Sequence, residues 1–173
     1  MNARIDDRIV NEATRPPAGP RLSAQQVWSA VARSSFAVIS HVTPAGAPRS
    51  SGVVYAVSGD SMYVAVAPDS WKARHIGADG MVSVTVPIRR GGPLSLIFPI
   101  PPATISFAGV ATLHPADMLT EAPGLARLVP AARLANCTIL EIRPIGHFVT
   151  YGLGVPLLQM RDPARARARI STT

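Results

Sequence analysis

From residue 35 onwards, short runs of apolar residues, several of them alternating with polar ones, are separated by turn residues. FAVISHV, APRSSGVVYAV and MYVAVA follow one another with only TPAG and SGDS between them. A connection between parallel strands needs about a dozen residues or more, so these connections are too short for one. The pattern predicts an antiparallel meander and disfavours a doubly wound nucleotide-binding fold.

Helical segments flank the predicted strands. Ser23 and Gln26 have the spacing of a capping box, and the apolar residues that follow recur at helical intervals, which predicts a helix from about Ser23 to Arg33. DSWKARHIGADG has a candidate N-cap at Asp69 or Ser70 and ends on glycine, as expected for two helical turns. PADMLTEAPGLARLVP predicts one or two further short helices.

The second half of the chain continues the β pattern. MVSVTVPI and ATISFAGVATLH each predict a strand, and NCTILEIRPIGHFVTYGLG predicts a pair of strands hinged at Pro144 and Gly146. Residues 89–102 are rich in proline, glycine and large apolar side chains; we expect them to fold back over the barrel, or to form a subunit interface or the wall of a ligand pocket. Six or seven strands with a few small helices favour a mainly β fold, a closed or split β-barrel, over a sandwich.

The composition fits one compact domain, since 47% of the 173 residues are hydrophobic and 16% are charged. We expect a flexible N-terminal arm over residues 1–20, a barrel domain over residues 21–155, and a basic tail over residues 156–173 that forms a short surface helix or stays disordered. A single cysteine, Cys137, cannot form an internal disulfide and is expected to be a buried structural thiol. With no secretory or membrane-spanning pattern, these features predict a cytoplasmic protein.

The charge balance favours an anionic partner. Seventeen basic and ten acidic residues give a net charge of +7, which suits a nucleic acid, an acidic lipid or a phosphorylated small molecule. Single-strand nucleic-acid sites interleave aromatic side chains with basic ones, whereas only 5% of this chain is aromatic. We therefore expect a small-molecule partner, with neither a nucleic acid nor a membrane as ligand.

Several common catalytic and binding motifs are absent from the sequence. It contains no GxxxxGK, GxGxxG, HExxH, CxxC or GxSxG pattern. The four histidines are far apart in sequence, without the spacing of metal ligands, and we expect no metal site.

The segment from Arg49 to His75 contains the strongest candidate for ligand binding. Ser70 and Lys72 begin the predicted helix, and free N–H groups at a helix N-terminus form a phosphate site together with a hydroxyl and an ammonium group. Arg49, in the strand start PRSSG, supplies a second cation. The alternative interpretation of Lys72, the only lysine of the chain, is a solvated helix residue.

The order of these features resembles the pyridoxamine 5′-phosphate oxidase-like proteins, whose fold is an FMN-binding split β-barrel. The resemblance covers roughly residues 24–115 and continues more loosely to Tyr151. It implies a six- to seven-stranded antiparallel split β-barrel, with the flavin along the second strand and its phosphate at the S-x-K segment. The cofactor-binding residues that it implies are Arg49, Ser50, Ser51, Gly52, Val53, Ala67, Ser70 and Lys72.

The resemblance also implies a homodimer that holds the flavin ring in a groove between subunits. The implied activity is hydride transfer between FMN and a small organic substrate, for which the cofactor supplies the chemistry, and no catalytic residue is assigned. The aromatic residues expected near the ring, or else in the core, are Tyr55, Trp71, Phe98 and Tyr151. Two alternatives stay open: a reductase that uses the deazaflavin coenzyme F-420, whose anionic tail suits the arginine surplus, and a non-catalytic flavin- or heme-binding barrel.

Overall fold

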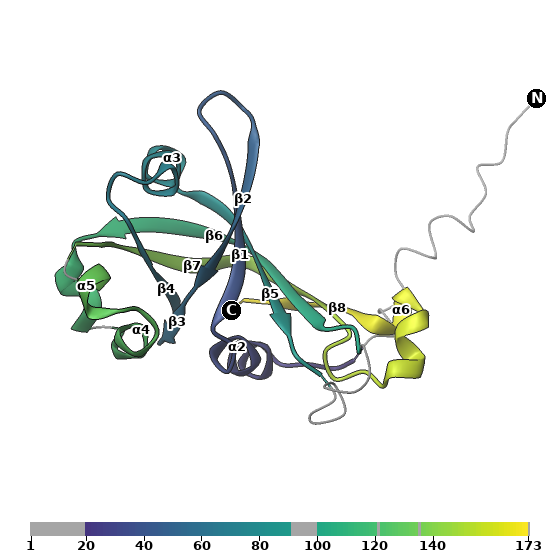
Figure 1. The fold of residues 1–173 in the computed structure, drawn as a ribbon. Coiled ribbons are helices and arrows are strands. Elements are labelled where there is room, and N and C mark those ends of the chain that lie inside the picture. Colours follow the sequence, from purple (N-terminus) through teal and green to yellow (C-terminus); the bar gives the residue numbers. More distant parts are fainter. Residues whose placement is uncertain (1–19, 91–99, 121, 135, 173) are drawn as a thin grey trace, which may run out of the picture.

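The computed structural model describes residues 20–90, 100–120, 122–134 and 136–172. Within these ranges, eight antiparallel strands form one sheet in the order β2-β1-β5-β6-β7-β4-β3, and β8 pairs with β7 outside this path. The sheet curls into a half-barrel with a few small helices around it (Figure 1), which confirms the predicted mainly β fold. The strands are β1 (Phe36–Val42), β2 (Pro48–Val54), β3 (Ala56–Ser58), β4 (Ser61–Val66), β5 (Met81–Ile88), β6 (Ala103–His114), β7 (Thr138–Tyr151) and β8 (Arg167–Ser171).

Short helices connect or cap the strands. None of the helices within the described ranges is long and apolar enough to cross a membrane. The α-helices are α2 (Ala24–Ala32), α3 (Trp71–Asp79), α4 (Pro123–Leu128), α5 (Ala131–Leu134) and α6 (Pro163–Ala166), and the 3-10 helices are η2 (Ala116–Thr120) and η3 (Leu157–Arg161).

Helix α2 has the predicted capping box. The Gln26 N–H donates to Ser23 Oγ (3.2 Å), and the Ser23 N–H donates to Gln26 Oε1 (2.9 Å), so two of the otherwise unpaired donors of the first turn are satisfied. Val27, Ala30 and Val31 form its buried face and pack into the main core inside the half-barrel. This packing closes one side of the core.

The predicted strand APRSSGVVYAV is divided in two at Tyr55. β2 pairs with β1 at one edge of the sheet, whereas β3 pairs with β4 at the other edge. Tyr55 lies between them with its side chain fully buried, and its hydroxyl donates to the Val31 carbonyl (2.6 Å). The chain therefore crosses from one edge of the curled sheet to the other at a residue that is anchored to α2.

The C-terminal half differs from the prediction in two places. β7 is one strand where a pair hinged at Pro144 and Gly146 was expected. Its pairing with β6 shifts register next to that point, since Ala108 pairs with Ile145 but Ser106 with Val149. The tail was expected to be a surface helix or disordered, but its residues 167–171 form β8 along β7. In β8 Ala168 is buried between the exposed Arg167 and Arg169, which is the period of a strand.

Candidate functional site

A cavity of about 600 Å³ lies where the end of β4 and the start of α3 face the helices α4 and α5. A volume of this size is typical of small-molecule sites. The lining residues come from five separate parts of the chain: Val54, Ala65, Val66, Ala67, Ser70, Lys72, Leu128, Val129, Pro130, Ala132, Arg133, Asn136 and Cys137. Three of the predicted cofactor-binding residues, Ala67, Ser70 and Lys72, are among them.

The start of α3 has the local structure of an anion site. Ser70 is the N-cap, and its Oγ accepts a hydrogen bond from the Ala73 N–H (3.2 Å). The first turn contains no acidic residue, and its other N–H groups have no partner within the helix. At the other end Gly80 adopts a left-handed φ of 75°, which ends the helix. The N-terminus of α3 therefore presents partial positive charge toward the cavity.

Two cationic side chains line this cavity from different elements. Lys72 is half-buried in the first turn of α3, and Arg133 belongs to the last turn of α5. Within the described ranges, no carboxylate lies at ion-pair distance from either side chain. Their charges are therefore available to an anion in the cavity.

Arg49 belongs to the same positively charged region, although it does not line the cavity. It pairs in register with His41, and Nε2 of His41 lies 3.4 Å from Nδ1 of His75 on α3. Burial lowers the pKa of His41, and the neighbouring His75, Arg49 and Lys72 lower it further. The charges of Arg49 and Lys72, the two predicted phosphate-binding cations, thus both lower the pKa of His41.

The side chains of β2 are divided between the two faces of the sheet. Val53 is buried in the core, and the Oγ of Ser51 is buried without a hydrogen-bond partner among the described residues. Ser50 faces outward, with its Oγ 2.7 Å from that of Ser40, and Gly52 is also exposed. Because successive strand residues point to opposite faces, a ligand outside the half-barrel meets Ser50 and Gly52 but not the side chains of Ser51 and Val53.

Gly52 lies against the ring of Phe36 on the neighbouring strand. A Cβ at Gly52 would come within 2.9 Å of that ring, and Phe36 is paired in register with Val54, which lines the cavity. Phe36 and Val54 are 48% and 44% exposed. Phe36, Gly52 and Val54 therefore form an apolar strip on the outer face of β1 and β2 that leads to the mouth of the cavity.

The residues from the second half of the chain are those that the sequence did not indicate. Arg133, Asn136 and Cys137 follow Lys72 by about sixty residues, and only the pairing of β4 with β7 brings them to α3. The Cys137 thiol donates to the Leu134 carbonyl (3.3 Å), and burial raises its pKa. This arrangement matches the expected buried structural thiol.

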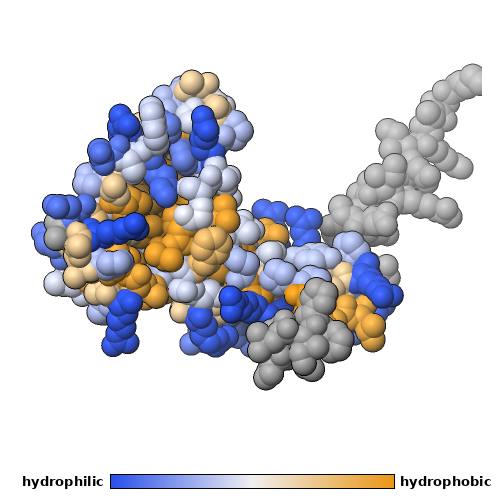
Figure 2. Space-filling view, viewed as in Figure 1, coloured by the Kyte–Doolittle hydropathy of each residue, from blue (hydrophilic) through white to orange (hydrophobic). Residues whose placement is uncertain are grey.

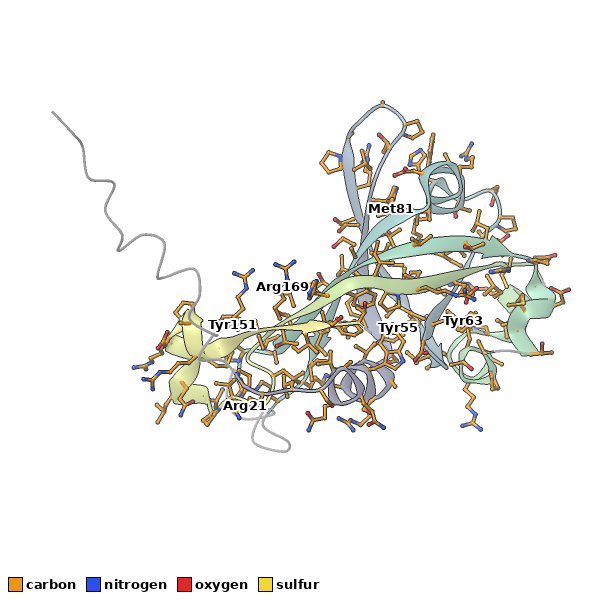
Figure 3. The ribbon with its side chains drawn as sticks, turned by 180° about the vertical axis from the view of Figure 1, so that it is seen from behind. Arg21, Tyr55, Tyr63, Met81, Tyr151 and Arg169 are labelled. Atoms are coloured by element: carbon orange, nitrogen blue, oxygen red, sulfur yellow. The ribbon has the colours of Figure 1, made fainter. Side chains whose placement is uncertain are left out.

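The aromatic residues expected around a ring system do not gather at this cavity. Tyr55 is in the core, and Trp71 is 69% exposed, with the Arg74 guanidinium 4.4 Å from its ring centre. Tyr151 lies toward α6, away from Tyr55 (Figure 3), and donates to the Met160 carbonyl (2.9 Å). Phe98 lies outside the described residues. Tyr55 therefore has the core position that was the alternative expectation for these side chains.

A buried carboxylate forms a second polar cluster, outside the cavity. Glu141 on β7 accepts hydrogen bonds from the Ser61 hydroxyl (2.8 Å) and from Arg143 Nε (2.9 Å), and its Oε2 lies 2.9 Å from His114 Nε2. Burial by itself raises the pKa of Glu141, but the bonds from Ser61, Arg143 and His114 outweigh it and hold the pKa below its ordinary value. The carboxylate is therefore ionised and tied to four neighbouring side chains, the fourth being Tyr63 at 3.4 Å.

Comparison with known proteins supports the fold. No protein-family model matches the sequence, and no curated protein matches it. A heme-binding protein from Mycobacterium smegmatis is 20% identical with a TM-score of 0.58, over 80% of this chain and 55% of that one. An F-420 reductase is 19% identical with a TM-score of 0.54, over 75% of this chain and 97% of that one. An FAD-binding protein from Mesorhizobium loti is 18% identical with a TM-score of 0.56, over 71% and 90%.

These structures share the split-barrel fold with this chain. The chain spans only about half the length of the heme-binding protein, but most of the length of the other two. At identities this low, the likeness establishes how the strands are arranged and leaves the ligand to be argued from the cavity.

Proposed function

We propose that the protein binds a flavin-type cofactor, FMN or the deazaflavin coenzyme F-420, with its phosphate at the start of α3, and that it is an oxidoreductase. The observation that carries this proposal is that Lys72 and Arg133 line the same cavity. Neither cation has a carboxylate partner in the described part of the chain. The ligands named for the neighbouring structures, F-420, FAD and heme, support a cofactor of this size.

The residues of the cavity fit the two ends of such a cofactor. Ser70, Lys72 and Arg133 offer a helix N-terminus and two cations to a phosphate, and guanidinium and ammonium groups bind phosphate through charge-assisted hydrogen bonds. Ala65, Ala67 and Val54 offer an apolar wall without bulky side chains. When bound, the flavin would supply the hydride chemistry, and the chain would orient it and exclude water.

Heme is supported less well than a flavin by the same cavity. A bound heme needs an axial ligand, and Cys137 is the one described lining residue of a type that commonly serves. Its thiol is engaged with the Leu134 carbonyl, and burial raises its pKa, so the thiolate that would ligate iron is disfavoured.

We also propose that the protein is a homodimer. Apolar side chains gather on the face of the half-barrel seen in Figure 2, below the β1–β2 hairpin. Phe36, Val54 and Leu128 are each more than two fifths exposed, and the last two are at the cavity. A second copy of the chain covering this face would bury the strip and enclose the cofactor. Light scattering tests this: a monomer at micromolar concentration would contradict it.

Cofactor titrations test the proposed function. We expect the purified protein to bind FMN or F-420 saturably, with one cofactor per chain, as followed by absorbance or by quenching of cofactor fluorescence. Hemin added in the same way serves as the comparison. Failure of both FMN and F-420 to bind, or tighter binding of hemin with a spectrum of thiolate-ligated iron, would overturn the proposal.

A further inference from the structure

A second cavity, of about 1030 Å³, lies where the end of α2, the start of β1 and the end of β5 meet (Figure 1). Its described lining residues are Ala30, Arg33, Ser34, Ser35, Phe36, Pro87, Ile88, Arg89, Arg90, Ile100, Pro102 and Leu153. None of them lines the cavity beside α3. The two cavities therefore share no described lining residue, although Phe36 of this one pairs in register with Val54 of the other. The volume of this cavity is at the upper end of the range for small ligands.

Three arginines give this cavity a strong positive charge. Arg33 is the C-cap residue of α2, and Arg89 and Arg90 follow β5 directly. In the ranges that the structure describes, no carboxylate is at ion-pair distance from any of them. The Arg90 guanidinium donates to the Val155 carbonyl, which fixes its position, while Arg33 and Arg89 are exposed.

The rest of the wall is apolar. Ile88, Ile100 and Leu153 line this cavity and are each partly exposed. Covering exposed apolar area is favourable by about 25 cal/mol per Å². A ligand that has both an apolar body and an anionic end therefore satisfies both parts of the wall, whereas a purely polar anion or a purely apolar molecule satisfies only one.

We propose that this second cavity binds an apolar small molecule with an anionic head group, a carboxylate or a phosphate, held by Arg33 and Arg89. None of the described lining residues is of the kind that ligates heme iron, which favours such a molecule over heme. Phe36 is the single aromatic residue of the described wall, which favours it over a single-stranded nucleic acid, whose bases stack on several. This proposal does not depend on flavin binding.

Calorimetric titration with a matched set of ten-carbon ligands tests the chemistry of the site. Decanoate and decyl phosphate carry the two head groups, and decanol and decylammonium are the neutral and cationic controls. We expect at least one of the two anions to bind one per chain, about tenfold or more tighter than either control. Which anion binds assigns the head group. Absence of binding by both anions, or equal binding of decanol, would overturn the proposal.

Arginine variants test the place of the site. Arg33→Ala and Arg89→Ala should each weaken binding of the anion about tenfold, the loss expected for one charge-assisted hydrogen bond. Arg127→Ala removes an equal charge from exposed α4, away from the cavity, and should leave binding unchanged. Equal weakening by Arg127→Ala, or none by Arg33→Ala and Arg89→Ala, would contradict the assignment. FMN titration of the same variants should match wild type, which separates a failure here from a failure of the proposed function.

Discussion

Nε2 of His41 lies 3.4 Å from Nδ1 of His75, and this contact joins strand β1 to helix α3. His41 is 8% exposed, and its Nδ1 has no partner among the described residues. The pair lies beside Arg49 and Lys72. Protonation of His41 is therefore disfavoured by burial and by its neighbours His75, Arg49 and Lys72. The proposed anion site thus lies beside a histidine on which positive charge is unfavourable.

The stability of the protein should fall as the pH falls through the range in which histidine titrates. The pKa of His41 is lowered from 6.5 in the folded protein, so the unfolded chain binds this proton more readily and unfolding is favoured as the pH drops below that value. Urea unfolding at about pH 7.5 and about pH 5.5 should show a smaller pH effect for His41→Gln than for wild type. The difference between the two proteins at about pH 8.5, where the histidine is neutral, controls for lost packing. An identical pH dependence of the two proteins would contradict the account.

Glu141 should be among the most sensitive positions for stability. Glu141→Ala leaves the buried Ser61 hydroxyl without its acceptor and removes the partner of His114 and Arg143, a loss of about 2–4 kcal/mol in the free energy of unfolding. Arg165→Ala is the control, because it removes an exposed ion pair with Asp162 worth at most about 1 kcal/mol. Similar losses for the two variants in urea unfolding would argue against a buried, ionised carboxylate.

The stability of the protein should fall again at lower pH, in the range in which Glu141 is protonated. The pKa of Glu141 is lowered from 4.5 in the folded protein, so the stabilisation by Glu141 is complete above that value and is lost as the pH falls through the folded pKa. Wild type should therefore lose further stability in acid, and Glu141→Ala should not show this additional loss.

Cofactor binding should protect Cys137 from thiol reagents. Burial raises the pKa of this thiol, so it should react slowly with a disulfide reagent in the folded protein, and a cofactor in the cavity that it lines should slow it further. It is the only cysteine of the chain, so the thiolate that the reagent releases measures the reaction of this one residue. The chain unfolded in guanidinium chloride gives the unprotected rate. A rate that saturating FMN leaves unchanged would place the cofactor elsewhere.

Periodicity predicted those strands whose two faces differ in polarity. Ala37, Ile39 and His41 of β1 are buried alternately with more exposed neighbours, and this pattern is visible in FAVISHV. The tail strand β8 was missed because alanine and arginine are both strong helix formers, and their alternation becomes a strand only through pairing with β7. The break at Tyr55 was missed because a buried tyrosine between two valine-rich runs has no distinguishing local signal.

In the candidate site, too, the sequence indicated the residues that belong to a local pattern and missed those that are distant along the chain. Ser70 and Lys72 were found because an N-cap and a helix start are local features of the sequence. Arg133 and Cys137 join them only through the pairing of β4 with β7, which no short pattern contains. The second cavity likewise combines residues from α2, β5 and the segment after β7.

The most direct test of the phosphate site compares FMN with riboflavin, which differ by the phosphate alone. Wild type should bind FMN at least about tenfold more tightly than riboflavin, and Lys72→Ala should lose most of that difference, since it removes a charge-assisted hydrogen bond of about 1.5–3 kcal/mol. Arg74→Ala, which removes an exposed cation of the same helix outside the cavity, should keep the difference. Equal affinities of wild type for FMN and riboflavin, or an unchanged ratio in Lys72→Ala, would contradict the account.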